Sequence, residues 1–348
     1  MSLSGKNKKK IIIIGGGISG LATLHYLKIK HYFNKNVDVQ LLEKRDHVGG
    51  TIRSIESNGY LFETGPNGFL DNKPRTLEFI KELNLEGDVI HADESAKMRY
   101  ISVSNTLHKF PTNPKDFFSF KLLNPLQKLR ILGEITTPRG RNVYETVYDF
   151  GKRRLGKRFV EIFLDPMVSG IYGGDVHQTI LSAAFPRIHQ LEQEYGSLFR
   201  AMGKLKRKRK QKTADTIGAP TGTLTSFEKG MTQIIDTLKS RYQKSIFLNQ
   251  QVQTISVRQK QYIIYSGNKQ YVADEIFLSV PAYEAASLIK GIDQNLTKNL
   301  TEITYAPMAV IGLVFPKNTF DQALEGFGYL IPSLEKKEVL GVLFDSNI

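Results

Sequence analysis

The chain has 348 residues, of which 41% are hydrophobic, with a formal net charge of +14 and no cysteine. This length allows a sizeable core and more than one domain, and the missing cysteines exclude disulfides, thiolate chemistry and zinc–sulfur sites. The charge favours an anionic partner such as a bilayer surface or a polycarboxylate substrate. Since the basic residues are scattered and resemble no nucleic-acid module, we expect no nucleic-acid partner. We also expect no membrane-spanning helix, because the sequence contains no run of about 18 apolar residues.

The N-terminal region predicts a dinucleotide-binding unit. Four isoleucines, typical of a buried strand, lead into Gly15-Gly16-Gly17-Ile18-Ser19-Gly20, which matches G-x-G-x-x-G before a helix. The first glycine of this pattern suits the tight turn, the second lets backbone approach a pyrophosphate, and the third lets the helix pack on the strand. The start of the helix would then face the phosphates with free N–H groups and its positive dipole end.

A second predicted strand, residues 37–42, ends at Glu43. A carboxylate at this place can bind both hydroxyls of an adenosine ribose. Gly49-Gly50-Thr51 follows, and a second glycine pair so close to the ribose acid is unusual for nicotinamide enzymes. The block 59–67, which includes Gly65-Pro66-Asn67, would by itself predict only a hairpin.

The central part of the chain changes from strands to helices. The apolar residues of 76–83 have helical spacing. Two strands that form a hairpin are predicted at 97–103 and 107–111, with the turn at Ser104-Asn105. The pattern of residues 114–200 is mainly helical. Phe117, Phe118 and Phe120 lie among lysines. This segment is either a core helix with a solvated face or a basic amphipathic surface that enters a bilayer interface, and both interpretations stay open.

The later helical part contains the most distinctive motifs. A helix over 146–155 precedes an apolar stretch that ends in a glycine-rich loop at Gly170, Gly173 and Gly174. The basic run 204–212 predicts a solvated loop. Further strands are expected at 246–248, 261–265, 270–277, 306–313 and within 326–343.

Two sets of motifs carry a resemblance to known flavoproteins. Glu43, the Gly49-Gly50 pair and the 59–67 block resemble flavoproteins of the amine oxidase and protoporphyrinogen oxidase superfamily. The motifs D-P-x-V-S-G-I-Y-x-G-D from Asp165, A-A-F-P from Ala183 and L-E-x-E-Y-G-S-L from Leu191 resemble the oxygen-dependent protoporphyrinogen oxidase family, including coproporphyrinogen oxidase of the same fold. One departure is His47, where many relatives have arginine.

The resemblance implies an α/β fold with three parts. These are a Rossmann-type FAD-binding domain (9–90 and 215–290), a mixed-sheet substrate-binding domain (91–113 and 291–348) and a helical membrane-associating insertion (114–205). The residues implied to bind FAD are Gly15, Gly16, Gly17, Ile18, Ser19, Gly20, Glu43, Lys44, Gly49, Gly50, Thr51, Gly65, Pro66, Asn67, Val252 and Ser279. Those implied to bind substrate are Arg99, Gly170, Phe327, Leu330 and Leu343.

The implied function is FAD-dependent oxidation of protoporphyrinogen IX by O2, with release of H2O2, in heme biosynthesis. The flavin would carry the chemistry, so no catalytic side chain and no metal are expected. The implied location is cytoplasmic, on the inner face of the cytoplasmic membrane, and the oligomeric state is open. The alternatives are coproporphyrinogen III as substrate, another flavoenzyme of the superfamily, or a non-catalytic remnant.

The C-terminus departs from the family pattern. The chain ends at Ile348 within what is a strand of the family, whose members continue into a second FAD-facing segment. We therefore expect a C-terminally truncated chain, for which flavin binding and activity are open questions. Leu340, Val342 and Leu343 are expected at a strand edge, which is an aggregation hazard.

Overall fold

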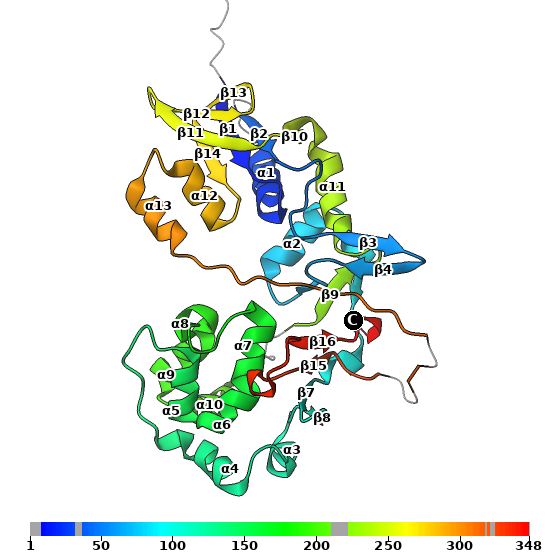
Figure 1. Ribbon diagram of the computed structural model, residues 1–348, viewed down its shortest axis with the longest axis vertical. Coiled ribbons are helices and arrows are strands. Elements are labelled where there is room, and N and C mark those ends of the chain that lie inside the picture. Colours follow the sequence, from blue (N-terminus) through cyan, green and yellow to red (C-terminus); the bar gives the residue numbers. More distant parts are fainter. Residues whose placement is uncertain (1–7, 32–36, 210–221, 317–318, 321–323, 348) are drawn as a thin grey trace, which may run out of the picture. The chain divides into compact units, whose positions relative to one another are not determined.

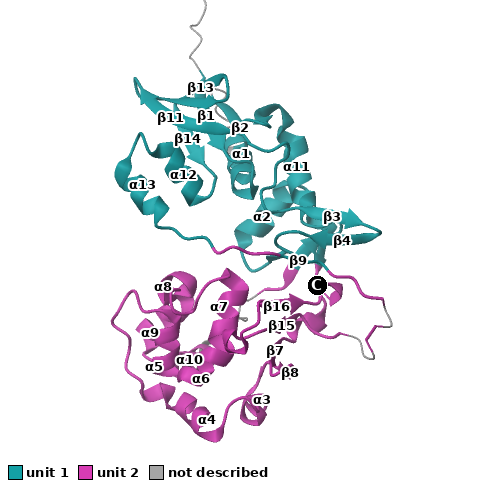
Figure 2. Ribbon diagram, in the orientation of Figure 1, with its two compact units in different colours: residues 1–90, 225–305, 310–312 teal, residues 91–224, 306–309, 313–348 magenta. Residues whose placement is uncertain are grey.

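The computed structural model describes residues 8–31, 37–209, 222–316, 319–320 and 324–347 (Figure 1). The chain forms two compact units (Figure 2). Unit 1 comprises residues 1–90, 225–305 and 310–312, and unit 2 comprises 91–224, 306–309 and 313–348.

Unit 1 is built on a four-stranded parallel sheet of order β10-β2-β1-β14. The strands are β1 (Lys9–Ile14), β2 (Val37–Leu42), β10 (Ile246–Phe247) and β14 (Glu275–Leu278). Residues 11–14 are all buried because both faces of β1 are covered. The expected Rossmann-type start, a strand followed by a glycine loop and helix α1 (Ile18–His31), is confirmed.

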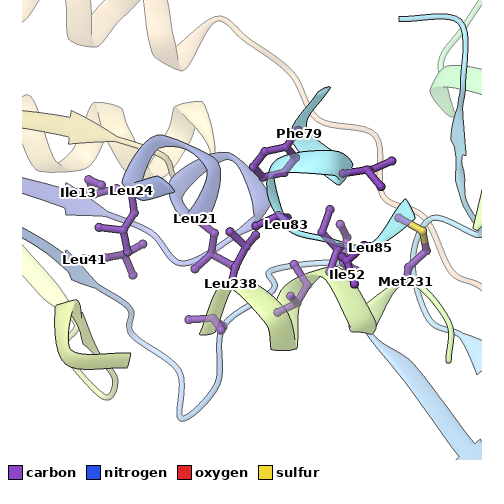
Figure 3. Close-up of a cluster of buried hydrophobic side chains, with 14 of the residues drawn as sticks. Ile13, Leu21, Leu24, Leu41, Ile52, Phe79, Leu83, Leu85, Met231 and Leu238 are labelled. Atoms are coloured by element: carbon purple, nitrogen blue, oxygen red, sulfur yellow. The ribbon is translucent and has the colours of Figure 1, made fainter. Parts of the chain in front are cut away.

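Successive side chains of β1 point to opposite faces of the sheet, so its isoleucines pack in two separate hydrophobic clusters. Ile11 and Ile13 pack with α1, α2 (Pro74–Glu82) and α11 (Thr232–Tyr242), and Figure 3 shows this cluster with Leu21, Leu41 and Leu238. Ile12 and Ile14 join a second cluster with an antiparallel meander. The meander consists of β11 (Val252–Arg258), β12 (Gln261–Ser266) and β13 (Lys269–Ala273).

The other elements of unit 1 lie around this framework. They are the hairpin β3 (Ser54–Ser57) and β4 (Tyr60–Glu63), with helices α12 (Ala282–Ile289) and α13 (Gln294–Thr301). A three-stranded sheet of order β5-β9-β6 is formed by β5 (Phe69–Leu70), β6 (Val89–His91) and β9 (Leu224–Phe227).

Unit 2 combines a four-stranded sheet, of order β16-β15-β7-β8, with a group of helices. Its strands are β7 (Tyr100–Val103), β8 (Thr106–Lys109), β15 (Gly328–Leu330) and β16 (Gly341–Leu343). Its helices are α3 (Pro114–Ser119), α4 (Pro125–Leu132), α5 (Val147–Arg154), α6 (Lys157–Phe159), α7 (Asp165–Tyr172), α8 (Leu181–Ala184), α9 (Pro186–Tyr195) and α10 (Leu198–Arg209). The predicted β7–β8 hairpin is confirmed, with positive φ at Ser104 and Asn105, and β16 lies at the sheet edge as expected.

Four local predictions were wrong. Gly170, expected in a glycine-rich loop, lies inside α7, which ends at Tyr172 just before Gly173. Residues 270–277 do not form one strand, because the chain passes from one sheet to another at Asp274. The Asp274 N–H donates to the Lys10 carbonyl at 2.8 Å, and the Lys10 N–H donates to Asp274 Oδ2 at 2.8 Å. Asp274 thus separates β13, in the meander, from β14, in the parallel sheet. Residues 306–313 form no strand, since no neighbouring strand pairs with them and Ile311 is 79% exposed. The basic run is helical up to Arg209, where α10 ends, and residues 210–212 lie outside the described part.

The helices of unit 2 enclose a buried cluster of charges. Arg154, which is fully buried, pairs with Glu134 and donates from Nε to Glu192 Oε1 at 2.7 Å. Ser197 Oγ donates to Glu134 at 2.6 Å, and the Gly196 carbonyl accepts from Arg154 at 2.9 Å. The L-E-x-E-Y-G-S-L motif therefore supplies a carboxylate, a carbonyl and a hydroxyl that join α9 to η3 (Gly133–Thr136) and α5.

Candidate cofactor and substrate site

The first and third glycines of the predicted motif are fixed by close backbone contacts. Gly15 has a φ of +107°, and a Cβ there would lie 2.4 Å from the Ser279 carbonyl oxygen. A Cβ on Gly20 would lie 2.0 Å from the Gly15 carbonyl oxygen. Any side chain at these positions would therefore disrupt the turn and the packing of α1 on β1.

Gly17 differs because the space beside it is open. A Cβ there would meet no described atom nearer than the Gly50 Cα, at 3.9 Å. Gly49 and Gly50 run alongside, with φ of +118° and +66°, and the Gly49 N–H donates to the Gly16 carbonyl at 2.8 Å. The two glycine segments thus form a surface of bare backbone at the start of α1, which fits a pyrophosphate.

Glu43 is buried at the end of β2, and its carboxylate is held by two backbone N–H groups. Gly16 donates to Oε2 at 2.5 Å and Arg45 donates to Oε1 at 2.9 Å. Each oxygen retains a further acceptor site, because a carboxylate has about four. The oriented carboxylate therefore fits the two hydroxyls of a ribose.

Val252 and Ser279 reach the same edge from distant parts of the sequence. The Gln250 N–H donates to the Glu43 carbonyl at 2.8 Å, and β11 begins at Val252. The Ser279 N–H donates to the Ile14 carbonyl at 2.8 Å. These bonds bring both residues to the carboxyl ends of the parallel strands, where α/β sheets bind ligands.

The remaining predicted FAD residues occupy varied environments. A Cβ on Gly65 would lie 2.0 Å from the Thr51 carbonyl oxygen, so the Gly65-Pro66-Asn67 segment closely approaches the second glycine segment. Lys44 forms an ion pair with Glu284 at 2.8 Å. At the start of α1, Ile18 packs partly on the core and Ser19 is exposed.

The five predicted substrate residues all lie in unit 2. The guanidinium of Arg99 lies over the ring of Phe327, 5.3 Å from its centroid. Burial lowers the pKa of Arg99 from its ordinary value, yet arginine stays charged in proteins. The Phe327 ring thus lies against a cation that directly precedes β7.

Leu330 and Leu343 share one face of the sheet. Gly328 pairs with Leu343 and Leu330 pairs with Gly341, so these four positions point the same way. The Leu330 side chain lies against Gly170 of α7, where a Cβ would be only 2.6 Å away. Leu343 is 44% exposed, which leaves apolar surface on this face.

A carboxylate from the D-P motif holds α7 beside this sheet. Asp165 accepts from the Ser333 N–H at 2.7 Å and from its Oγ at 2.9 Å. Ser333 follows β15 after a short turn. The motif therefore has a positioning role that sequence reasoning did not assign.

Sequence reasoning also missed His25, which is fully buried on α1. Its ring nitrogens lie 2.9 Å from Glu82 Oε2 and 2.7 Å from Tyr242 Oη, and burial raises the pKa of Tyr242. These bonds link α1, α2 and α11, and no local pattern indicates them because the partners are distant in sequence.

The fold and the glycine-lined edge define a Rossmann-type dinucleotide-binding protein. The chain belongs to the flavin containing amine oxidoreductase family, whose model matches residues 18–347. This membership confirms the expected cofactor, FAD, and the expected class, an FAD-dependent oxidoreductase.

Named relatives agree with the resemblance. A chloroplastic protoporphyrinogen oxidase of Oryza sativa is 30% identical over 97% of this chain and 66% of its own length. A coproporphyrinogen III oxidase of Staphylococcus aureus is 28% identical over 97% of this chain and 74% of its own. The chain thus spans about two thirds of the plant relatives' length.

A solved structure supports the fold. A protein from Exiguobacterium sp. 255-15, provisionally named a protoporphyrinogen oxidase, superposes with a TM-score of 0.75 at 22% identity. The match covers 98% of this chain and 73% of that one.

Proposed function

We propose that the protein oxidises a porphyrinogen to a porphyrin in heme biosynthesis, with protoporphyrinogen IX as substrate and O2 as acceptor. The main support is that relatives named for this activity align over 97% of the chain. Coproporphyrinogen III is the second candidate, because relatives named for that substrate align over 97% and 93%.

The proposed division of work leaves the redox chemistry to FAD. FAD, when bound, would supply the two-electron redox chemistry that links porphyrinogen oxidation to reduction of O2 to H2O2. Three turnovers would account for the six electrons and six hydrogens that separate porphyrinogen from porphyrin, with three H2O2 formed. Glu43 would hold the ribose, and the backbone around Gly17 and Gly50 would lie against the pyrophosphate and the flavin side. The protein would thereby position the cofactor without supplying a nucleophile.

Substrate binding is assigned to the sheet of unit 2. Leu330, Leu343 and Gly170 would contact the macrocycle, and Arg99 would pair with a propionate. Phe327 would keep the guanidinium in place through the contact at 5.3 Å.

Arg99→Ala is expected to raise KM for the porphyrinogen about ten- to a hundredfold, because a charge-assisted pair contributes roughly 1.5–3 kcal/mol. Steady-state porphyrin fluorescence measures the effect, and flavin content is expected to stay constant. Lys109→Ala, an exposed cation of the same sheet, is the control and should leave KM unchanged. An unaltered KM in Arg99→Ala would show that Arg99 binds no propionate.

Comparing kcat/KM for protoporphyrinogen IX and coproporphyrinogen III tests the substrate. A higher value for the first supports the primary assignment. A higher value for the second selects the alternative, and turnover of amines alone would place the protein elsewhere in the superfamily.

We also propose that the protein binds the inner face of the cytoplasmic membrane peripherally through α3 and α4. Within the described ranges, no helix is both long and apolar enough to span a bilayer. Of the three predicted phenylalanines, Phe118 is 57% exposed, whereas Phe120 is buried and Phe117 packs on the core. Leu126 and Leu129 are 77% and 65% exposed beside Lys128 and Arg130, so the apolar surface is centred on α4.

The pair Leu126→Ser/Leu129→Ser is expected to weaken binding to anionic vesicles at least about a hundredfold, since each inserted leucine contributes roughly 1.5–3 kcal/mol. Vesicle flotation measures this effect. Leu77→Ser/Leu296→Ser, two exposed leucines of unit 1, is the matched control. Equal flotation of all three proteins would contradict the assignment to α4.

A further inference from the structure

The loop before α5 lines a hollow in unit 2 that the proposed reaction does not use. The hollow is open to solvent and has a volume of about 530 Å³. It is lined by residues 138–143 and by His189 and Gln193 of α9. This volume lies within the range of small-molecule sites. The loop can be followed between α4 and α5 in Figure 1.

The lining carries uncompensated positive charge. Arg139 and Arg141 have no ion-pair partner in the part of the chain that the structure describes. The two nearby carboxylates, Glu145 and Glu192, are already paired with Arg153, at 2.7 and 2.9 Å. Two arginines that form no ion pair within the described residues therefore line the hollow, and the Arg139 guanidinium lies beside Gly196.

Hydrogen bonds fix the loop that carries these arginines. Arg153 Nη1 donates to the Pro138 carbonyl at 2.8 Å, and the Gly140 N–H donates to Glu192 at 3.0 Å. Gln193 Nε2 donates to the Gly140 carbonyl at 3.1 Å. Because the loop is anchored to the buried charge cluster, binding an anion would cost little ordering entropy.

On one side of α9, His189 lies one turn before Gln193, so both side chains face the loop. The guanidinium groups of the two arginines, together with the imidazole of His189 and the amide of Gln193, suit an anion that has several oxygen atoms. Arginine binds phosphate oxygens in a bidentate manner, which makes a phosphate group the fitting ligand.

Exposed apolar side chains lie next to the arginines along the chain, and one of them, Val143, belongs to the lining itself. Leu132 and Ile135 precede the loop and are 45% and 43% exposed, and Val143 and Tyr144 are 62% and 74% exposed. Cations beside exposed apolar and aromatic groups match the interface between lipid headgroups and acyl chains.

We propose that the hollow formed by residues 138–143, His189 and Gln193 binds a phosphate group, and that its source is the headgroup of an anionic lipid. The choice of a lipid over a soluble phosphate rests on the proposed membrane association. The inference that the hollow binds a phosphate group does not depend on that proposal. Arg139 and Arg141 would contact the phosphate oxygens while the flanking apolar residues enter the interface.

The experiment compares the double variant Arg139→Gln/Arg141→Gln with Lys206→Gln/Arg207→Gln, which removes the same charge from the exposed surface of α10. Binding is measured by flotation with phosphatidylcholine vesicles containing or lacking phosphatidylglycerol, and by calorimetric titration with inorganic phosphate. Thermal melting of each variant confirms that the fold is retained.

We expect the pocket variant to lose at least about tenfold in affinity for the phosphatidylglycerol vesicles, and the control variant to lose less than about twofold. Excess inorganic phosphate should compete with vesicle binding of the unaltered protein and of the control variant, but not with the residual binding of the pocket variant. If the pocket variant loses phosphate binding but floats normally, the source is a soluble phosphate and the lipid assignment is overturned. Equal effects of both variants in both assays would overturn the proposed phosphate site. If only the Leu126→Ser/Leu129→Ser variant behaves unexpectedly, by floating as the unaltered protein does, only the proposed membrane contact of α4 is overturned.

Discussion

Gly17→Val is expected to abolish FAD retention while leaving the fold intact. The space beside Gly17 is open, with the nearest described atom at 3.9 Å, so unit 1 can accept the new side chain. The valine would occupy the place of the pyrophosphate and remove its contacts with backbone N–H groups. Loss of two charge-assisted bonds corresponds to about 3 kcal/mol or more, a weakening of roughly a hundredfold.

Flavin absorbance after reconstitution and desalting measures the effect of Gly17→Val. Gly87→Val is the matched control, because a Cβ at Gly87 meets nothing within 4 Å and the residue lies outside the glycine segments. The control should retain flavin as the unaltered protein does. A stoichiometric yellow Gly17→Val protein would contradict the assignment of the glycine loop.

Arg154→Leu is expected to destabilise unit 2 by about 3–5 kcal/mol, because it leaves the carboxylates of Glu134 and Glu192 buried with their main cation removed. Urea unfolding followed by circular dichroism measures the loss. Arg158→Leu is the control, since its pair with Glu161 is long, at 3.5 Å, and partly exposed, and such pairs contribute about 0–1 kcal/mol. Equal stability of the two variants would contradict the structural role of the cluster.

The destabilisation by Arg154→Leu should depend on pH. Burial alone would raise the pKa of Glu192, but bonds from the Gly140 N–H and from Arg154 and Arg153 outweigh it and lower that pKa. A lowered pKa contributes stability above the unfolded value of about 4.3, and this contribution is lost as pH falls through the folded value. The variant lacks much of this contribution, so the gap between it and the unaltered protein should narrow in acid.

The FAD-binding start could be predicted because its determinants are local. Gly15 and Gly17 lie between β1 and α1, Gly20 lies in the first turn of α1, and Glu43 directly follows the adjacent strand β2. Each glycine is needed for a close backbone contact, and the glutamate is needed to accept hydrogen bonds from a ribose. The spacing of these residues along the sequence is enough to predict both roles. The hairpin at Ser104 and Asn105 was predictable for the same reason.

The charge cluster could not be predicted because its partners are far apart in sequence. Glu192 was identified only as part of a family motif, and Arg154 and Glu134 were not singled out at all. The strand expected at 306–313 failed for a related reason. A strand needs a neighbour to pair with, and an apolar pattern alone does not supply one.

The account is tested most directly by anaerobic titration of the FAD-reconstituted protein with protoporphyrinogen IX, followed by admission of O2. We predict that the porphyrinogen bleaches the flavin bands, and that O2 restores them with one H2O2 formed per flavin reoxidised. A protein that binds FAD but is not bleached by either porphyrinogen, or one that retains no flavin at all, would contradict the proposed function.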